Sequence, residues 1–215
     1  TIAELTPMLD AARRTAYAPI PRAVDAADHA LSHAQLRLWV LAQLEGALTA
    51  YNMPASLLLE GRVDRAAIDL AFAALVRRHE SLRTTFTVVD GAPRQHVHGA
   101  PLGGVEFVDV SSEADPAARA RELAFEHARR PFDLERGPLL RITLVRLETD
   151  SHALLFNLHH IVSDDWSMGV LVNEFVRLHD AHASGEASAL VPLRLHYRDY
   201  AAWQNARLAA DGMAE

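Results

Sequence analysis

The order of helical and strand-like patterns along the chain is the feature that most limits its fold. After Asp64, apolar residues recur every three to four positions, which is the spacing of one face of an α-helix. Two runs with strand character, 139–147 and 153–162, instead follow each other with no helix between them. This mixture of interleaved and consecutive elements predicts an α+β fold, in which helices pack on a mixed β-sheet, rather than strict alternation around a parallel sheet.

Further elements follow from capping residues and apolar spacing. Ser32 is expected to cap a helix that runs to about Leu44 and turns Leu36, Trp39, Val40 and Leu44 inward. After Asp165, a long helix is expected to place on one side Met168, Leu171, Val172, Phe175 and Val176. Helices are also predicted over 1–14, 115–130 and from 197 past 207, and strands over 55–60, 84–89, 94–98 and 105–110, with a hairpin turn at Asp90-Gly91.

The composition argues against several classes of function. The 21 basic and 28 acidic residues give a net charge of −7, so the chain has no bulk attraction for nucleic acid, whose binding depends on phosphate contacts. No apolar run approaches the ~20 residues that span a bilayer. Without cysteine there are no disulfides, thiolate nucleophiles or cysteine-based zinc sites. The first residues lack the pattern of a secretory signal, and the expected location is the cytoplasm.

Residues 157–169, NLHHIVSDDWSMG, combine a pair of histidines with a pair of aspartates. If the preceding residues form a strand, His159 and His160 point to opposite faces and cannot both line one cleft. One histidine is then structural and the other can face a substrate. Asp164 and Asp165 fall where the next helix begins, and acids at that position cap free N–H groups.

Three interpretations of this stretch follow from the residues alone. A histidine at the end of a strand can act as a general base, since its ordinary pKa of ~6.5 suits proton transfer near neutral pH. The pair can equally be two hydrogen-bonded structural histidines before a capped helix, which is the commoner role of such a pair. A metal site built from His159, His160 and an aspartate is disfavoured by the opposite strand faces.

The stretch 159–165 resembles the HHxxxDG signature of condensation domains of nonribosomal peptide synthetases, and of chloramphenicol acetyltransferase-like acyltransferases in general. Other stretches resemble motifs of the same family in the same order: LSHAQLRLWVL (31–41), RHESLRTTF (78–86), RPFDLERGPLLR (130–141) and YRDYAAW (197–203). Together they span residues 31–203. The resemblance implies a lobe with the chloramphenicol acetyltransferase-like fold.

The resemblance also implies a division of the chain. Residues 1–14 are similar to the C-terminal helix of a peptidyl carrier domain, and residues 15–30 to the linker that follows it. Residues 31–215 correspond to the N-terminal lobe of a condensation domain, which has two lobes with the active site between them. The later motifs of the family are missing, so we expect the C-terminal lobe to be a partner and this lobe alone to show little or no turnover.

The implied reaction joins two carrier-bound substrates. An upstream donor carrier domain presents an acyl or peptidyl thioester on its phosphopantetheine arm, and a downstream acceptor carrier domain presents an aminoacyl group whose amine attacks that thioester. No cofactor or metal is bound by the lobe itself. His160 matches the catalytic histidine of the motif and His159 its neighbour. Asp164 matches the structural aspartate, for which Arg83 is the expected partner.

Two positions near His160 leave open questions. Ser167 is expected either to donate a hydrogen bond near the thioester or to cap the first turn of the helix. Asp165 replaces the glycine of the motif. Aspartate tolerates unusual backbone conformations and can cap the helix, but its carboxylate would favour imidazolium and could crowd the pantetheine tunnel. Reduced activity, an engineered change and a tolerated variant are all consistent with it.

Two other functions are compatible with the same motifs. The first is a complete single-lobe acyltransferase of the chloramphenicol acetyltransferase type, which would act as a trimer and use a CoA donor. The second is a degenerate, non-catalytic module that docks carrier domains. The carrier-like leader and the peptide-synthetase motifs favour the condensation domain over the trimer, and the presence of His160 and Asp164 disfavours the degenerate module.

Overall fold

The computed structural model describes residues 19–44, 49–186 and 190–210, so the helix predicted over 1–14 lies outside the described residues. The described strands are β1 (His29–Ala30), β2 (Asn52–Glu60), β3 (Thr84–Val89), β4 (Ala92–Val97), β5 (Val105–Asp109), β6 (Leu140–Glu148) and β7 (Ser151–His159). The helices are α2 (His33–Ala42), α3 (Arg65–Arg78), the short 3₁₀ helix η1 (Glu80–Arg83), α4 (Pro116–Arg129), α5 (Asp165–Ser184) and α6 (Tyr197–Ala210).

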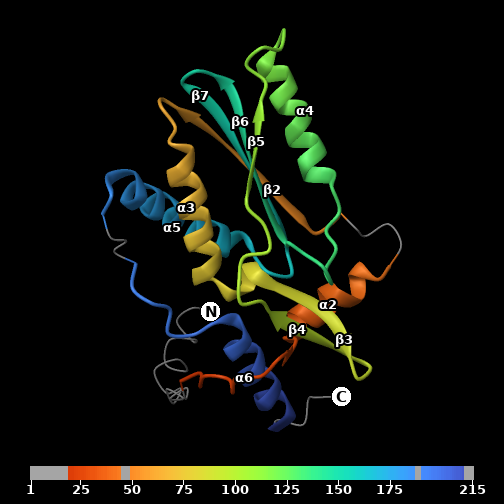
Figure 1. The fold of residues 1–215 in the computed structure, drawn as a ribbon. Coiled ribbons are helices and arrows are strands. Elements are labelled where there is room, and N and C mark those ends of the chain that lie inside the picture. The colour runs from red at the N-terminus through yellow and green to blue at the C-terminus, as the bar shows by residue number, and fades with distance from the viewer. Residues whose placement is uncertain (1–18, 45–48, 187–189, 211–215) are drawn as a thin grey trace, which may run out of the picture.

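The strands form two sheets (Figure 1). The larger sheet has the order β2-β7-β6-β5, in which β7 pairs antiparallel with both β2 and β6, whereas β5 runs parallel to β6. The smaller sheet, β1-β4-β3, is antiparallel and contains the predicted hairpin, whose turn residues Asp90 and Gly91 have φ values of 50° and 80°. The predicted mixed sheet with packed helices is confirmed.

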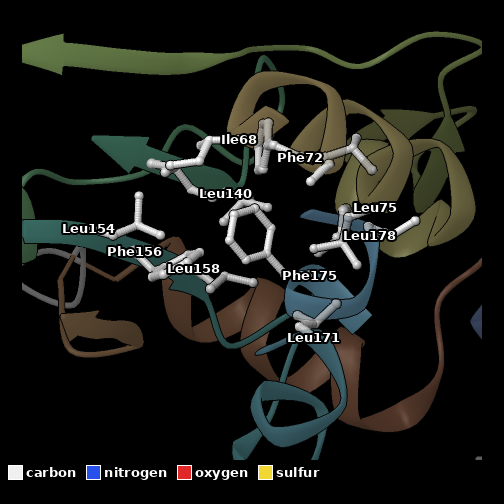
Figure 2. Packing of buried hydrophobic residues seen from close by; sticks show 14 of the residues in the cluster. Ile68, Phe72, Leu75, Leu140, Leu154, Phe156, Leu158, Leu171, Phe175 and Leu178 are labelled. Atoms are coloured by element: carbon white, nitrogen blue, oxygen red, sulfur yellow. The ribbon is translucent and has the colours of Figure 1, made fainter. Parts of the chain in front are cut away.

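Helices cover both faces of the larger sheet: α3 and α5 lie on one face and α4 lies on the other (Figure 1). Alternation along β7 supplies both interfaces. Leu154, Phe156 and Leu158 pack into the main core with α3 and α5 (Figure 2), while Leu155 packs with Ala120 of α4. This core fixes β7, and with it the point at which the strand ends and the histidine pair begins.

The helices begin at side-chain caps that the sequence predicted. Ser32 accepts a hydrogen bond from the Gln35 N–H, and the Gln35 side chain accepts one from the Ser32 N–H, which together form a capping box. Asp64 caps α3 and Asp164 caps α5 in the same way through their carboxylates.

The predicted inward face of α2 is wrong. Leu36, Val40 and Leu44 are 40%, 50% and 56% exposed. The capping box turns Gln35 inward instead, and one and two turns later the inward positions are 38, 39 and 42. For similar reasons Val176 of α5 is 48% exposed, since the buried stripe of that helix continues at Leu178.

The described part of the predicted linker, residues 19–30, is attached to the rest of the chain. The Ala23 N–H donates to Oδ1 of Asp199 at 2.8 Å, Nε of Arg22 donates to the Arg194 carbonyl at 3.1 Å, and β1 pairs with β4. Among the described residues, no helix combines the length and apolar character needed to cross a membrane.

Phe175→Ala is predicted to destabilise the protein by about 3 to 5 kcal/mol, because it removes a buried ring that packs against Phe156 and leaves a cavity between α5 and the sheet. The matched control is Val176→Ala, the next residue of the same helix, which is expected to change stability by less than about 0.5 kcal/mol because its side chain is exposed. Urea unfolding of the three proteins measures both. Equal losses in the two variants would contradict the orientation of α5.

Candidate active site

The histidine pair lies where β7 ends and a tight turn leads into α5. The strand ends at His159, three residues earlier than predicted. Backbone hydrogen bonds hold the turn on both sides: the His160 N–H donates to the Tyr51 carbonyl at 2.9 Å, and the Val162 N–H donates to the His159 carbonyl at 3.1 Å. The turn is therefore anchored before any side chain is considered.

His159 is a buried structural residue, 3% exposed. Its Nδ1 accepts a hydrogen bond from the Ile161 N–H at 3.1 Å, and its ring lies 6.0 Å from Phe132 and 6.4 Å from Tyr51, measured between ring centroids. Burial, with a smaller contribution from His160, lowers the pKa of His159 to about 4. The ring is therefore neutral near pH 7, with its proton on Nε2.

His160 points the other way, as the alternation argument predicted, and is exposed. Its Nδ1 lies 2.8 Å from the Ser163 carbonyl oxygen. A carbonyl can only accept a hydrogen bond, so Nδ1 carries the proton and the lone pair of the neutral ring is on Nε2. This arrangement gives His160 an accepting nitrogen that faces outward.

Asp164 caps α5 instead of pairing with an arginine. Its Oδ1 accepts from the Ser167 N–H at 2.8 Å and from the Ser167 hydroxyl. The hydroxyl bond is the largest cause that lowers the pKa of Asp164, followed by the backbone bond. Ser167 therefore has the capping role of the two that the sequence left open.

The expected pairing of Arg83 with Asp164 is wrong. Arg83 donates to the His98 carbonyl, and its Nη2 lies 3.7 Å from Oε1 of Glu80 one turn earlier in η1. Glu80 also lies 3.0 Å from Nε of Arg198 on α6. The arginine thus joins η1 to the β3-β4 hairpin, and in the described part of the chain no ion pair links it to Asp164.

Asp165 occupies the first position of α5, and its side chain is exposed. Of the described residues other than glycine, Asp90 alone has a positive φ, so the backbone at Asp165 does not require glycine. The negative charge is favourable at a helix N-terminus. The difference between aspartate and the motif glycine is therefore one of volume and charge beside His160, not of backbone strain.

A pocket of about 210 Å³ lies in front of these residues. It brings together four of the stretches that resemble family motifs: Gln35 from the first, Ser81 from the second, His160 from the third and Tyr197 from the last. The Tyr197 hydroxyl lies 3.0 Å from Oγ of Ser32, the cap of α2. In the described residues, no group of three or more histidine, aspartate or glutamate side chains is arranged to hold a metal ion.

Two lining residues were missed by the sequence analysis. Gln35 was overlooked because polar residues were not expected on the inner face of α2, although its place three residues after Ser32 is the signal of a capping box. Tyr197 was included only as the first letter of YRDYAAW. Its position in the pocket depends on how α6 packs, which no local pattern encodes.

A family model of the condensation domain matches residues 26–215. This chain belongs to the condensation domain family. The matched region contains the whole turn, both flanking elements and every residue of the pocket. The resemblance inferred from the motifs is confirmed.

The curated relatives of this condensation domain chain are large synthases. It is 45% identical over 195 residues to one of the proteins that make up linear gramicidin synthase in Brevibacillus parabrevis, covering 88% of this chain and 2% of that protein. It is 39% identical over 212 residues to surfactin synthase subunit 1 of Bacillus subtilis (strain 168), covering 99% of this chain and 6% of that protein. The chain therefore spans a small part of the length of each of these relatives.

Solved structures of the family show the same fold. The X-domain from teicoplanin biosynthesis has a TM-score of 0.80 and 31% identity, over 91% of this chain and 42% of that one. The starter condensation domain of rhizomide synthetase has a TM-score of 0.77 and 24% identity, over 86% of this chain and 46% of that one. The predicted chloramphenicol acetyltransferase-like fold is confirmed, and this chain spans less than half of either solved chain.

His159→Asn is predicted to reduce the loss of stability in acid. The pKa of His159 in the folded state, about 4, lies below its ordinary value of 6.5, so the unfolded chain binds an extra proton between these values. The stability that depends on neutral His159 is complete above pH 6.5 and is lost as the pH falls toward 4, by on the order of 3 kcal/mol. Urea unfolding at several pH values measures this difference between variant and wild type.

The control for this comparison is His182→Asn, which removes an exposed histidine near the end of α5 and should follow the wild type at every pH. Parallel curves for wild type and His159→Asn would contradict a buried, neutral His159.

Proposed function

We propose that this chain is the catalytic-histidine lobe of a condensation domain that forms amide bonds between carrier-bound substrates. The observation that carries the proposal is the hydrogen bond from Nδ1 of His160 to the Ser163 carbonyl, because it leaves Nε2 free to accept a proton at the edge of the pocket. The curated relatives, named as synthases of gramicidin and surfactin, support amide formation as the reaction.

In the proposed reaction, the amine of an acceptor aminoacyl group attacks the carbonyl carbon of a donor thioester. A carbon–nitrogen bond forms, the carbon–sulfur bond breaks, and the amine loses one proton while the leaving thiolate gains one. Nε2 of His160 takes the proton as the bond forms and returns it to the thiolate. An α-amine with a pKa near ~8 is already partly neutral at pH 7, so orienting the amine contributes as much as removing its proton.

The proposed partners are two peptidyl carrier domains and a second lobe. The donor and acceptor are delivered on phosphopantetheine arms, which belong to the carriers and not to this chain. Residues 1–14 are proposed to be the last helix of the upstream carrier domain, 15–30 the linker, and 31–215 the N-terminal lobe. The 42% coverage of the teicoplanin X-domain supports a second lobe that completes the cleft, and a cytoplasmic location stays a prediction.

The family assignment and the synthase relatives support this reaction over a trimeric CoA-dependent acyltransferase. The accepting nitrogen of His160 supports it over a non-catalytic docking module. Alone, the 215-residue chain is expected to give little turnover, because the opposite wall of the cleft would be absent.

His160→Ala is predicted to lower the rate of amide formation by about 10² to 10⁴-fold, which is the usual contribution of general base catalysis. The assay uses the longer synthetase that contains this chain, with a donor thioester and an acceptor aminoacyl group loaded on its carriers, and detects the peptide by mass spectrometry. His182→Ala, a histidine near the far end of α5, is the matched control and should leave the rate unchanged. A His160→Ala enzyme as active as this control would overturn the assignment.

Asp165→Gly is predicted to raise the rate in the same assay. The substitution removes a carboxylate beside His160 and restores the smaller residue of the motif, while the backbone at this position accepts either residue. Unfolding by urea provides the control for stability, since loss of a first-turn acid is expected to cost about 0.3 to 1 kcal/mol. An unchanged or lower rate would show that Asp165 does not obstruct the substrates.

A further inference from the structure

The stretch 130–141, RPFDLERGPLLR, joins α4 to β6 but supplies no group to the proposed proton transfer. Its polar ends are nevertheless held by an extended set of hydrogen bonds. Side chains on three adjacent strands, Asn52 of β2, Asn157 of β7 and Arg141 of β6, donate to carbonyls at the end of α4 and just beyond, over distances of 2.6 to 3.4 Å. Because the last carbonyls of a helix lack intrahelical partners, these donors fix where α4 ends and where the next residues begin.

Arg141 is the charged member of this set, and it also contacts an aromatic ring. Its Nη2 donates to the Arg130 and Pro131 carbonyls at 2.8 and 2.9 Å, and its guanidinium carbon lies 3.7 Å from the centroid of the Phe132 ring. Burial is the main cause that lowers the pKa of Arg141 to about 10, which leaves it a cation near neutral pH. The negative end of the α4 dipole and the ring face both favour that charge.

Phe132 passes this constraint to the histidine pair. It is 7% exposed, and its ring meets the His159 ring edge to face, with 6.0 Å between centroids and 85° between planes. It also belongs to the buried cluster that contains Ile161. Phe132 therefore touches both ends of the hydrogen bond from the Ile161 N–H to His159 Nδ1, the bond that shapes the turn carrying His160.

The middle of the stretch is equally constrained. Oδ1 of Asp133 accepts two backbone N–H groups that follow it, and the Gly137 N–H donates to the Asp133 carbonyl at 2.9 Å. Gly137 has a φ of 63°, and a Cβ there would lie 3.1 Å from Leu102 and 3.2 Å from Thr85, so glycine is required by both conformation and space. Phe132 is thus presented by a closed turn and not by a loose loop.

We propose that Arg141 and Phe132 are positioning residues of the active site, which orient His159 so that the turn of residues 160–163 presents His160 to the pocket. Neither residue lines the pocket in front of His160. They act through a chain of contacts: the α4 carbonyls hold Arg141, Arg141 holds the Phe132 ring, and Phe132 holds His159. The consequence for catalysis rests on the proposed function, whereas the positioning itself is a property of this chain.

The test compares Arg141→Lys with wild type on the 215-residue chain. Lysine keeps the positive charge but loses the planar face that covers Phe132 and the fork that spans two carbonyls. Two NMR readouts report on the turn alone: the pKa of His159, followed through its ring Cε1–H signal, and the exchange rate of the Ile161 amide. We expect the pKa of His159 to rise from about 4 toward 6.5 and the Ile161 amide to exchange about tenfold faster.

Arg146→Lys is the matched control, because Arg146 lies on the same strand and its side chain is 37% exposed in an ion pair with Asp109. It should leave both readouts unchanged. Phe132→Leu keeps apolar bulk without the aromatic ring and should shift both readouts as Arg141→Lys does. It carries the test if Arg141→Lys unfolds, which would be seen as faster exchange at all core amides.

Readouts in Arg141→Lys and Phe132→Leu that match the Arg146→Lys control would overturn the proposal. This outcome is distinct from failure of the proposed function. An inactive synthetase assay would leave the NMR result intact, and an unperturbed His159 would leave the His160→Ala rate comparison intact.

Discussion

The hydrogen bond from the Ile161 N–H to Nδ1 of buried His159 is the interaction on which the geometry of the site depends. It converts the end of a central strand into a tight turn whose next hydrogen bond, from His160 to the Ser163 carbonyl, selects the nitrogen that can accept a proton. The bond requires a neutral His159, and the apolar surroundings that lower its pKa maintain that state. Two adjacent histidines thus acquire opposite roles from burial alone.

Helix caps do much to shape the pocket as well as to stabilise helices. Ser32 begins α2 and lies against the Tyr197 hydroxyl of α6, while Asp164 begins α5 beside His160. Because each cap is fixed by backbone N–H groups, the polar groups near the pocket are oriented by bonds that also hold the fold together. Substitution of a cap is therefore expected to alter both stability and the site.

Local patterns predicted much of this molecule, and long-range packing decided the rest. The cap at Asp64, the two faces of β7 and the separation of His159 from His160 all follow from spacing within one element. The partner of Arg83 did not, because Glu80 one turn away competes with an acid distant in sequence, and only the packed structure ranks the two. Tyr197 entered the site for the same kind of reason, since α6 packs back on α2.

The protonation state of the two histidine rings in the folded chain at neutral pH tests this geometry most directly. Long-range proton–nitrogen NMR correlations on the histidine-labelled protein identify which ring nitrogen carries the proton. We predict opposite tautomers: a proton on Nε2 of His159 and a proton on Nδ1 of His160. The same tautomer in both rings, or a proton on Nε2 of His160 in the neutral ring, would contradict the assignment of one structural and one catalytic histidine.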